Sequence, residues 1–327
     1  MDRLNGRFGL SWFGVSRVPE PLDWMREHVG GRGSTRTQYL SGLNVFRSWA
    51  AQWCGDMALR WYHINMELLK GYEVYCRERY SASRYNFLLM VLRMCLDMAL
   101  EDGKVPFHNR EAVTFLHKCH VTTRVKDDGR IALSREQVNL LYALKRLKGN
   151  WKVVRDMFVL QCLTSLRFSN LTGADFRAYR NCRAFEIIQK KEKASCNQWV
   201  SLDYDSRIGE ILERNGWRFP EISLATYNLY VKKLVKRLPM SHRQVKIKTR
   251  MANGTIRVES KPFFEAVRSH NGRRTFITEL RSNPNVQDRD LAVFTGHKTL
   301  ALLEVYDKTS KQRRVANVLR AVGKRTI

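Results

Sequence analysis

The sequence is short of acidic residues. Its 327 residues include 31 Asp and Glu against 58 Lys and Arg, so the formal net charge is +27 at pH 7. A solvated surface usually mixes charges of both signs, and an excess of this size along the whole chain indicates a polyanionic partner. The basic residues recur in every segment and are interleaved with aromatic residues. Nucleic acid is therefore favoured over an anionic membrane surface, which a single basic amphipathic helix would serve.

Long hydrophobic runs are also absent. No stretch approaches the ~20 apolar residues of a membrane-spanning helix, and the best candidate, residues 87–100, is interrupted by Arg93 and Asp97. The N-terminus begins Met-Asp-Arg and has no apolar signal core. We therefore expect an intracellular protein that makes no membrane contact. It should associate with DNA in the cytoplasm or nucleoid, or in the nucleus if the host is eukaryotic.

Paired cysteines are missing as well. The seven cysteines are odd in number and never form a Cys-x-x-Cys pair, so reduced and mostly buried thiols are expected. His117, Cys119 and His120 lie close together, but no fourth ligand follows at the spacing of a zinc finger. The sequence therefore predicts no metal site.

The periodicity of the apolar residues predicts an all-helical first domain over residues 34–120, after a leader over residues 1–33. Thr35 and Gln38 form a capping-box pattern where its first helix should begin. Further helices are predicted over residues 62–76 and 83–100, with a short apolar piece near Phe115. Residues 121–133 are polar and contain the turn signal Asp127-Asp128-Gly129, which is typical of a linker.

The second domain is predicted over residues 134–327. Ser134 and Gln137 repeat the capping-box pattern and begin a helix that should end at Gly149, and another helix follows over residues 151–163. Residues 183–188 and 199–202 predict two strands on either side of a charged tip, Lys190-Lys191-Glu192-Lys193. The fold class expected for the whole chain is mainly α with small β hairpins.

Two further elements of this domain are strongly basic. A helix is predicted over residues 226–238, and Asn253-Gly254 is a strong signal for a second hairpin. Their basic side chains could contact DNA phosphates, although the hairpin could equally be a surface elaboration. These candidate DNA-binding residues are Lys232, Lys233, Lys236, Arg237, Lys246, Lys248 and Arg250.

Four short stretches of the second domain stand out together. They are Thr164-Ser165-Leu166-Arg167, the lysine-rich tip, Ser269-His270-Asn271-Gly272-Arg273-Arg274-Thr275-Phe276, and Thr295-Gly296-His297 followed by Tyr306. In order and spacing they resemble the tyrosine recombinase, or phage integrase, family. Its catalytic domain carries Arg, a hairpin Lys, His-x-x-Arg, a His or Trp, and a nucleophilic Tyr in that order. The resemblance implies a core DNA-binding domain before a mixed α+β catalytic domain, and the catalytic set Arg167, Lys191, His270, Arg273, His297 and Tyr306.

These residue types suit the cleavage of a phosphodiester without metal. The planar guanidinium groups of Arg167 and Arg273 can clamp the non-bridging oxygens, with a further bond from His297. Tyr306 has a reference pKa of ~10 and must lose its proton as it attacks, for which His270 is the best assistant. A tip lysine can protonate the departing 5′ oxygen. Lys191 fits the family spacing best, although Lys190 and Lys193 are alternatives.

The resemblance also implies a 3′-phosphotyrosyl intermediate, no cofactor or ATP, and a homotetramer on paired double-stranded DNA sites. An apolar stripe at residues 315, 318, 319 and 322 indicates a C-terminal helix that docks in its own domain or in a neighbouring protomer. Two positions depart from the family pattern. Asn170 stands where many members have an acidic residue that braces the first Arg, and Ser165 replaces a usual Gly.

Two other functions are compatible with the same sequence. A type IB topoisomerase-like enzyme uses nearly the same chemistry but reseals the strand that it cut. A non-catalytic DNA-binding protein could retain the fold, although the presence of all six residues argues against it. We therefore predict a site-specific recombinase.

Overall fold

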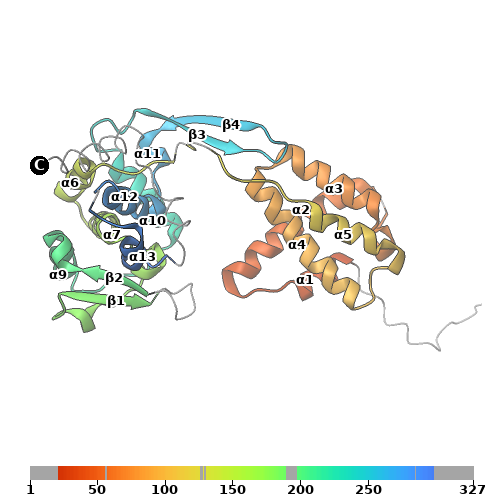
Figure 1. Ribbon diagram of the computed structural model, residues 1–327, viewed down its shortest axis with the longest axis horizontal. Helices are drawn as coiled ribbons and strands as arrows, with labels where there is room; N and C mark the ends of the chain where they lie inside the picture. The colour runs from red at the N-terminus through yellow and green to blue at the C-terminus, as the bar shows by residue number, and fades with distance from the viewer. Residues whose placement is uncertain are drawn as a thin grey trace, which may run out of the picture. The chain divides into compact units, whose positions relative to one another are not determined.

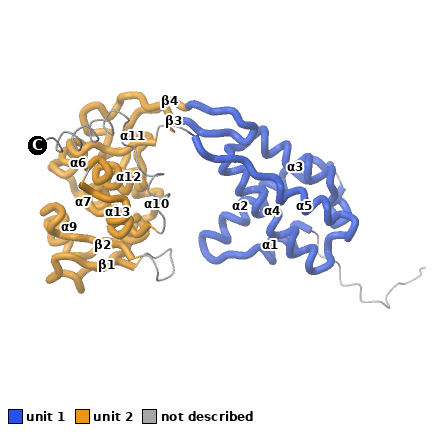
Figure 2. Tube along the Cα trace, in the orientation of Figure 1, with its two compact units in different colours: residues 1–126, 248–258 blue, residues 127–247, 259–327 orange. Residues whose placement is uncertain are grey.

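The computed structural model describes residues 21–297 apart from residues 56, 126–127, 129, 189–196 and 284. The chain divides into two compact units (Figures 1 and 2). Unit 1 comprises residues 1–126 and 248–258, and unit 2 comprises residues 127–247 and 259–327. The first boundary falls inside the segment expected to be a linker. Lys191, Tyr306 and the apolar stripe at residues 315–322 lie outside the described residues.

In its described residues, unit 1 has five helices around one apolar core. They are α1 (Pro21–His28), α2 (Gly33–Cys54), α3 (Met66–Arg79), α4 (Ala82–Glu101) and α5 (Arg110–Lys118), with single 3-10 turns at Trp61–His63 and Phe107–Asn109. The apolar stripe of α2 lies in the core as its spacing predicts, since Leu43, Phe46 and Trp49 are buried. Asn65 and Ser81 cap α3 and α4 by accepting bonds from backbone N–H groups.

The beginning of α2 differs from the prediction. The Thr35 and Gln38 capping box was wrong, because α2 begins at Gly33 after Arg32 and has no side-chain cap. The Arg36 guanidinium holds this connection instead, by donating to the carbonyls of Val29 and Arg26 at 2.5 and 2.9 Å. Part of the region read as a leader is also structured: α1 places Trp24 and Met25 in the core of unit 1.

The hairpin predicted around Asn253-Gly254 is confirmed and consists of β3 (Gln244–Arg250) and β4 (Ile256–Pro262). Gly254 takes the positive φ that its turn requires. The end of this hairpin belongs to unit 1. Ala252 is 2% exposed within the core of unit 1, and its N–H donates to the Tyr80 carbonyl at 3.0 Å. The hairpin end is thus a structural part of the helical unit.

Burial of Ala252 yields a stability prediction. Ala252→Asp should lower the free energy of unfolding of unit 1 by about 3 kcal/mol, because it places a carboxylate in an apolar core. Asn253→Asp adds the same charge one residue further on. It should have little effect, since Asn253 is exposed and uses only its side-chain oxygen, to accept from Thr255. Urea denaturation of the two variants checks this, and equal losses of stability would contradict the assigned burial.

The described part of unit 2 is mainly helical and has one further hairpin. Its elements are α6 (Arg135–Ala143), α7 (Asn150–Thr164), α8 (Phe168–Leu171), β1 (Ala184–Ile188), β2 (Asn197–Ser201), α9 (Ser206–Arg214), α10 (Leu224–Val235), α11 (Phe263–Ala266), α12 (Ser269–Arg281) and α13 (Asp288–Thr295), with 3-10 turns at Arg177–Tyr179 and Leu202–Tyr204. Every residue of α7 from Val154 to Thr164 is buried, so α7 is the central helix of this unit.

Strands β1 and β2, which we call the lysine hairpin, confirm the predicted strand pair; the lysine-rich tip between them lies outside the described residues. They pair antiparallel, from Ala184 opposite Ser201 to Ile188 opposite Asn197. The capping box of Ser134 and Gln137 is also confirmed at the start of α6.

The predicted end of α6 at Gly149 was wrong, since the helix ends at Ala143. The buried Arg155 side chain donates to the Tyr142 and Leu144 carbonyls at 2.7 and 2.9 Å. It thereby satisfies acceptors that a longer helix would have used.

The predicted fold class, mainly α with small β hairpins, is confirmed. Among the described helices, none combines the length and apolar character needed to cross a membrane.

Candidate active site

Helix α12 carries the His-x-x-Arg motif and lies against the central helix α7. A Cβ atom added to Gly272 would stand 2.7 Å from the Cβ atom of Gln161 on α7, so only glycine allows this approach. Gln161 is itself buried, donates to the Leu166 carbonyl at 2.9 Å and accepts from the Tyr227 hydroxyl at 2.7 Å. These contacts bring α12 next to the loop after α7, which bears Arg167.

Among the predicted site residues that the structure describes, Arg273 is the most deeply buried, with 1% of the residue exposed. Its Nη1 donates to the Ser165 carbonyl at 2.9 Å, and its Nη2 donates to the Thr295 carbonyl at 2.6 Å. The same Nη2 lies 3.0 Å from Nε2 of His297. Because two segments of unit 2, the end of α7 and the end of α13, supply these partners, the guanidinium group is held from two sides.

His297 follows α13 and is 8% exposed. The Thr295 hydroxyl donates to the Leu291 carbonyl at 2.8 Å and lies 2.6 Å from Nδ1 of His297. Since that hydroxyl has already used its proton, we assign the imidazole proton to Nδ1, which donates to Thr295. Nε2 is then the acceptor that faces Arg273.

The charges of Arg167 and Arg273 both affect the pKa values of His270 and His297, so these four side chains lie near one another. Burial, followed by the charges of Arg273 and Arg167 and the nearby His270, lowers the pKa of His297 to about 3. Loss of hydration, then the charges of Arg274, Arg273 and Arg167, lowers the pKa of His270 to about 4. His270 is exposed, so water screens these charges more strongly there than at His297. Both imidazoles are neutral near pH 7.

The loop that bears Arg167 begins with an unusual backbone conformation. Ser165 ends α7 with φ 63° and ψ 10°, in the left-handed region that favours glycine. Here a serine adopts a conformation that glycine enters more readily. The turn aims the Ser165 carbonyl at Arg273 and leads directly into Arg167.

The structure therefore brings together Arg167, His270, Arg273 and His297, which we call the cationic cluster. Lys191 and Tyr306 lie outside the described residues.

The predicted DNA-binding residues lie elsewhere on the chain. Those of α10 and the turn after it cover aromatic rings: Lys233 and Arg237 lie over Trp151, and Lys236 lies over Phe264. Lys232 is half-buried on the same helix, and Lys246 and Lys248 lie on β3. Arg250 donates to the Arg124 carbonyl at 3.0 Å, so it also has a structural contact within unit 1.

Sequence reasoning did not assign roles to Thr295, Gln161 or Asn271, which support the cluster. Asn271 donates to the Ile131 carbonyl at 2.6 Å and so fastens the start of α12 to the segment before α6. Gln161 offered a usable signal, since it is a polar residue inside the otherwise apolar run from Met157 to Leu163. A buried polar side chain of this kind normally has specific hydrogen-bond partners.

The two histidines on either side of Cys119 have partners other than a metal ion. His117 pairs with Asp97 at 2.9 Å, and Nε2 of His120 lies 3.2 Å from the Asn86 amide nitrogen. Over the described ranges, no group of three or more His, Cys, Asp or Glu side chains is placed to bind a metal ion.

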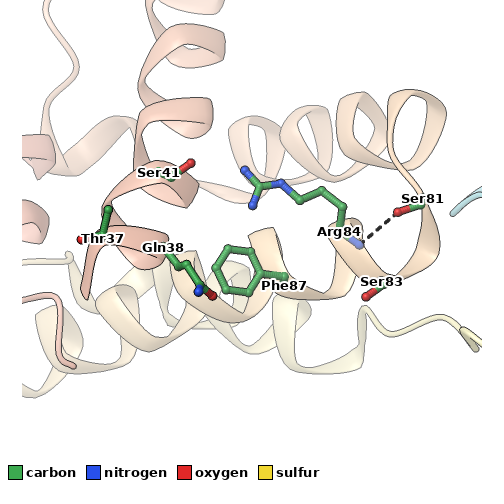
Figure 3. Close-up of a pocket in the computed structure, with 7 residues that line it drawn as sticks. All are labelled: Thr37, Gln38, Ser41, Ser81, Ser83, Arg84 and Phe87. Carbon is green, nitrogen blue, oxygen red and sulfur yellow. Dashed lines mark hydrogen bonds between the residues drawn. The ribbon is translucent and has the colours of Figure 1, made fainter. Parts of the chain in front are cut away.

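A separate pocket of about 510 Å³ lies in unit 1 between α2 and the start of α4 (Figure 3). Its lining combines hydroxyl groups, one amide, one guanidinium group and one aromatic ring: Thr37, Gln38, Ser41, Ser81, Ser83, Arg84 and Phe87. The Arg84 guanidinium lies over the Phe87 ring at 5.2 Å. None of the six predicted catalytic residues lines this pocket, which combines hydrogen-bonding groups with apolar surface.

Comparison with known proteins finds similarity at the level of structure. No protein-family model and no curated protein matches the chain. The Tn1549 transposon integrase, in complex with transposon right end DNA, has 12% identity and a TM-score of 0.62 over 93% of this chain and 100% of that one. A lambda integrase dimer bound to a COC′ core site has 15% identity and a TM-score of 0.62, over 89% of this chain and 95% of that one.

The chain has the tyrosine recombinase fold. A lambda integrase tetramer bound to a Holliday junction is also similar, with 15% identity and a TM-score of 0.53 over 88% of this chain and 76% of that one. These identities fit a divergent member of the recombinase fold, in agreement with the resemblance noted in the sequence.

Burial of neutral His297 predicts a pH dependence of stability. Its pKa is lower in the folded protein than the ~6.5 of an unfolded chain, so between these values the unfolded state binds the extra proton. Stability should therefore fall as the pH falls from about 6.5 toward 3, by up to about 1.4 kcal/mol per pH unit from this residue. Chemical denaturation from pH 7.5 to 5 should show a shallower dependence for His297→Asn. His108→Asn, at an exposed histidine, should match the wild type, and identical slopes for all three proteins would refute the assignment.

Proposed function

We propose that this chain is a site-specific DNA recombinase that cleaves and rejoins DNA through a 3′-phosphotyrosyl intermediate on Tyr306, without metal or ATP. The observation that carries the proposal is the cationic cluster, in which a buried guanidinium group is held beside His297 and near Arg167 and His270. Its occurrence in the fold of integrases that were captured on DNA supports the same reaction class.

The cluster suits a phosphate that gains negative charge in the transition state. Arg273 is oriented by the Ser165 and Thr295 carbonyls before DNA binds, so little reorganisation is required when the charge develops. Arg167 supplies the second guanidinium group of the clamp. An incoming phosphate would raise the pKa of His297 by offsetting the nearby cations, and a proton gained on Nε2 would let this ring donate to the phosphate.

In the proposed cleavage step, one phosphorus–oxygen bond forms, another breaks, and two protons are transferred. The Tyr306 oxygen attacks phosphorus while its proton passes to His270, which is unprotonated near pH 7. The bond between phosphorus and the 5′ oxygen breaks, and the ammonium group of Lys191 gives that oxygen a proton. Because one phosphoester replaces another, a 5′ hydroxyl can later reverse the step on the same or a partner duplex.

We also propose that the protein acts on double-stranded DNA as a homotetramer. The lambda integrase structure with a similar fold is a tetramer on a Holliday junction, which supports this assembly. The apolar stripe at residues 315–322 is the candidate contact between protomers.

Covalent trapping tests the proposed reaction. The substrate is a duplex from the DNA that flanks the coding region, with a nick near the cleavage point so that religation is lost. The wild type should form a denaturation-resistant protein–DNA adduct, and Tyr306→Phe should form none. Arg273→Lys should slow adduct formation by about 10²-fold or more, because one ammonium group cannot replace the oriented fork.

The matched control for that experiment is Arg289→Lys, which makes the same exchange at an exposed position of α13. It should react like the wild type. Adduct formation by Tyr306→Phe, or none by the wild type on its own site, would overturn the proposal.

Unit 1 is proposed to contact the DNA through the pocket between α2 and α4. Hydroxyl, amide and guanidinium groups bind phosphate and base edges, and Arg84 supplies a positive charge there. Arg84→Ala should weaken DNA binding by about tenfold and reduce the salt dependence by about one phosphate contact. Fluorescence anisotropy at several salt concentrations measures both. Arg110→Ala removes the same charge at the exposed start of α5 and should bind like the wild type; equal losses would remove the pocket from the interface.

A further inference from the structure

The lysine hairpin of unit 2 is fastened to the Arg167 loop by two buried amide side chains. On the β1 side, the Asn170 amide nitrogen donates to the carbonyl of Ile188, the last residue of β1, at 3.2 Å. On the β2 side, the Gln198 amide nitrogen donates to the carbonyl of Thr164, the last residue of α7, at 2.6 Å. Asn170 is 4% exposed and Gln198 is 0% exposed.

Both hydrogen bonds join the segment around Arg167 to the open end of the β1–β2 strand pair. Asn170 follows Arg167 in the same short turn, and its N–H donates to the Arg167 carbonyl at 2.9 Å. Thr164 directly precedes Ser165, whose carbonyl accepts from Arg273. Ile188 and Asn197 face each other across the open end of the strand pair, from which the chain continues into the lysine-bearing tip. The Asn170 amide thus links the β1 side of this opening to the turn that bears Arg167. The Gln198 amide links the β2 side to the backbone next to Ser165, which holds Arg273.

Three amide side chains beside the hairpin opening also have buried oxygen atoms without a partner. The side-chain oxygens of Asn170, Asn197 and Gln198 are buried, and in the described part of the chain they have no hydrogen-bond partner. Buried acceptors are normally paired, so acceptors left open around the hairpin opening mark a place prepared for a donor. An amide can hold the hairpin through its N–H group and still offer an oxygen, without adding a negative charge next to the phosphate clamp.

We infer that Asn170 and Gln198 are positioning residues that set the hairpin, and with it the lysine that protonates the leaving 5′ oxygen, relative to Arg167. This rests on the proposed function. Asn170 then compensates for the missing acidic brace by a different contact, since it bonds to the hairpin backbone. Gln198 provides the matching contact from the opposite strand.

A change of leaving group tests this inference. In a substrate whose bridging 5′ oxygen is replaced by sulfur, the bond between phosphorus and sulfur breaks and a thiolate leaves. A thiol has a reference pKa of ~8.5, against ~16 for water, so the thiolate needs no proton from the protein. Loss of a correctly placed acid should therefore slow cleavage of the oxygen substrate only.

The variants are Asn170→Leu and Gln198→Met, which remove the amide with little change in volume. Each should slow single-turnover cleavage of the oxygen substrate by about 10- to 100-fold, because a small misplacement of the acid has a large effect on rate. On the sulfur substrate each should return to within a few-fold of the wild type. DNA affinity, measured by anisotropy, should not change. If the Leu variant fails to fold in a thermal melt, Asn170→Ser makes a smaller change and carries the same expectation.

Three controls separate the possible outcomes. Lys191→Ala should behave like the two variants, Arg273→Lys should stay slow on both substrates, and Glu186→Gln, at an exposed position of β1, should match the wild type. Variants that are equally slow on both substrates, or unaffected on both, would overturn the inference. Absence of any adduct with the wild type on either substrate would overturn the proposed function itself.

Discussion

Unit 2 depends on one physical constraint, the burial of the Arg273 guanidinium group. A charge with 1% of its residue exposed can be kept inside a protein only where fixed dipoles replace its water. The Ser165 and Thr295 carbonyls and the His297 ring provide those dipoles, and they come from the end of α7 and the end of α13. The close approach of α12 to α7 at Gly272 brings the arginine within their reach.

The same burial determines the electrostatic state of the site. Burial, followed by the charges of Arg273 and Arg167, lowers the pKa of His297 to about 3, so this ring is neutral near pH 7. A protein that holds Arg167 and Arg273 in this way has a strong preference for an anion at the cluster. The phosphodiester of the proposed reaction supplies that anion, and it would simultaneously restore the ability of His297 to carry a proton.

Polar side chains inside the packed helices perform most of the positioning. Gln161 donates to the loop after α7, Asn271 donates to the segment before α6, and Asn170 and Gln198 bond the β1–β2 hairpin to its neighbours. These bonds are directional, whereas apolar packing alone would leave the segments free to slide. In unit 1 a backbone group has this role. Ala252, at the end of the β3–β4 hairpin, lies in the apolar core, and its N–H group donates to the Tyr80 carbonyl.

By itself, the sequence determined the helical periodicity, the Ser134 capping box, both hairpins and the order of the motif residues, because these depend on neighbours along the chain. It also indicated a polyanionic partner through its net charge. Only the tertiary structure decided that Ser165 takes a left-handed turn, that Arg155 ends α6 early, that Arg36 replaces a capping box at α2, and that Ala252 enters the core of unit 1. Each of these results depends on a partner distant in sequence or on the packing around it, and neither local propensity nor spacing carries that information.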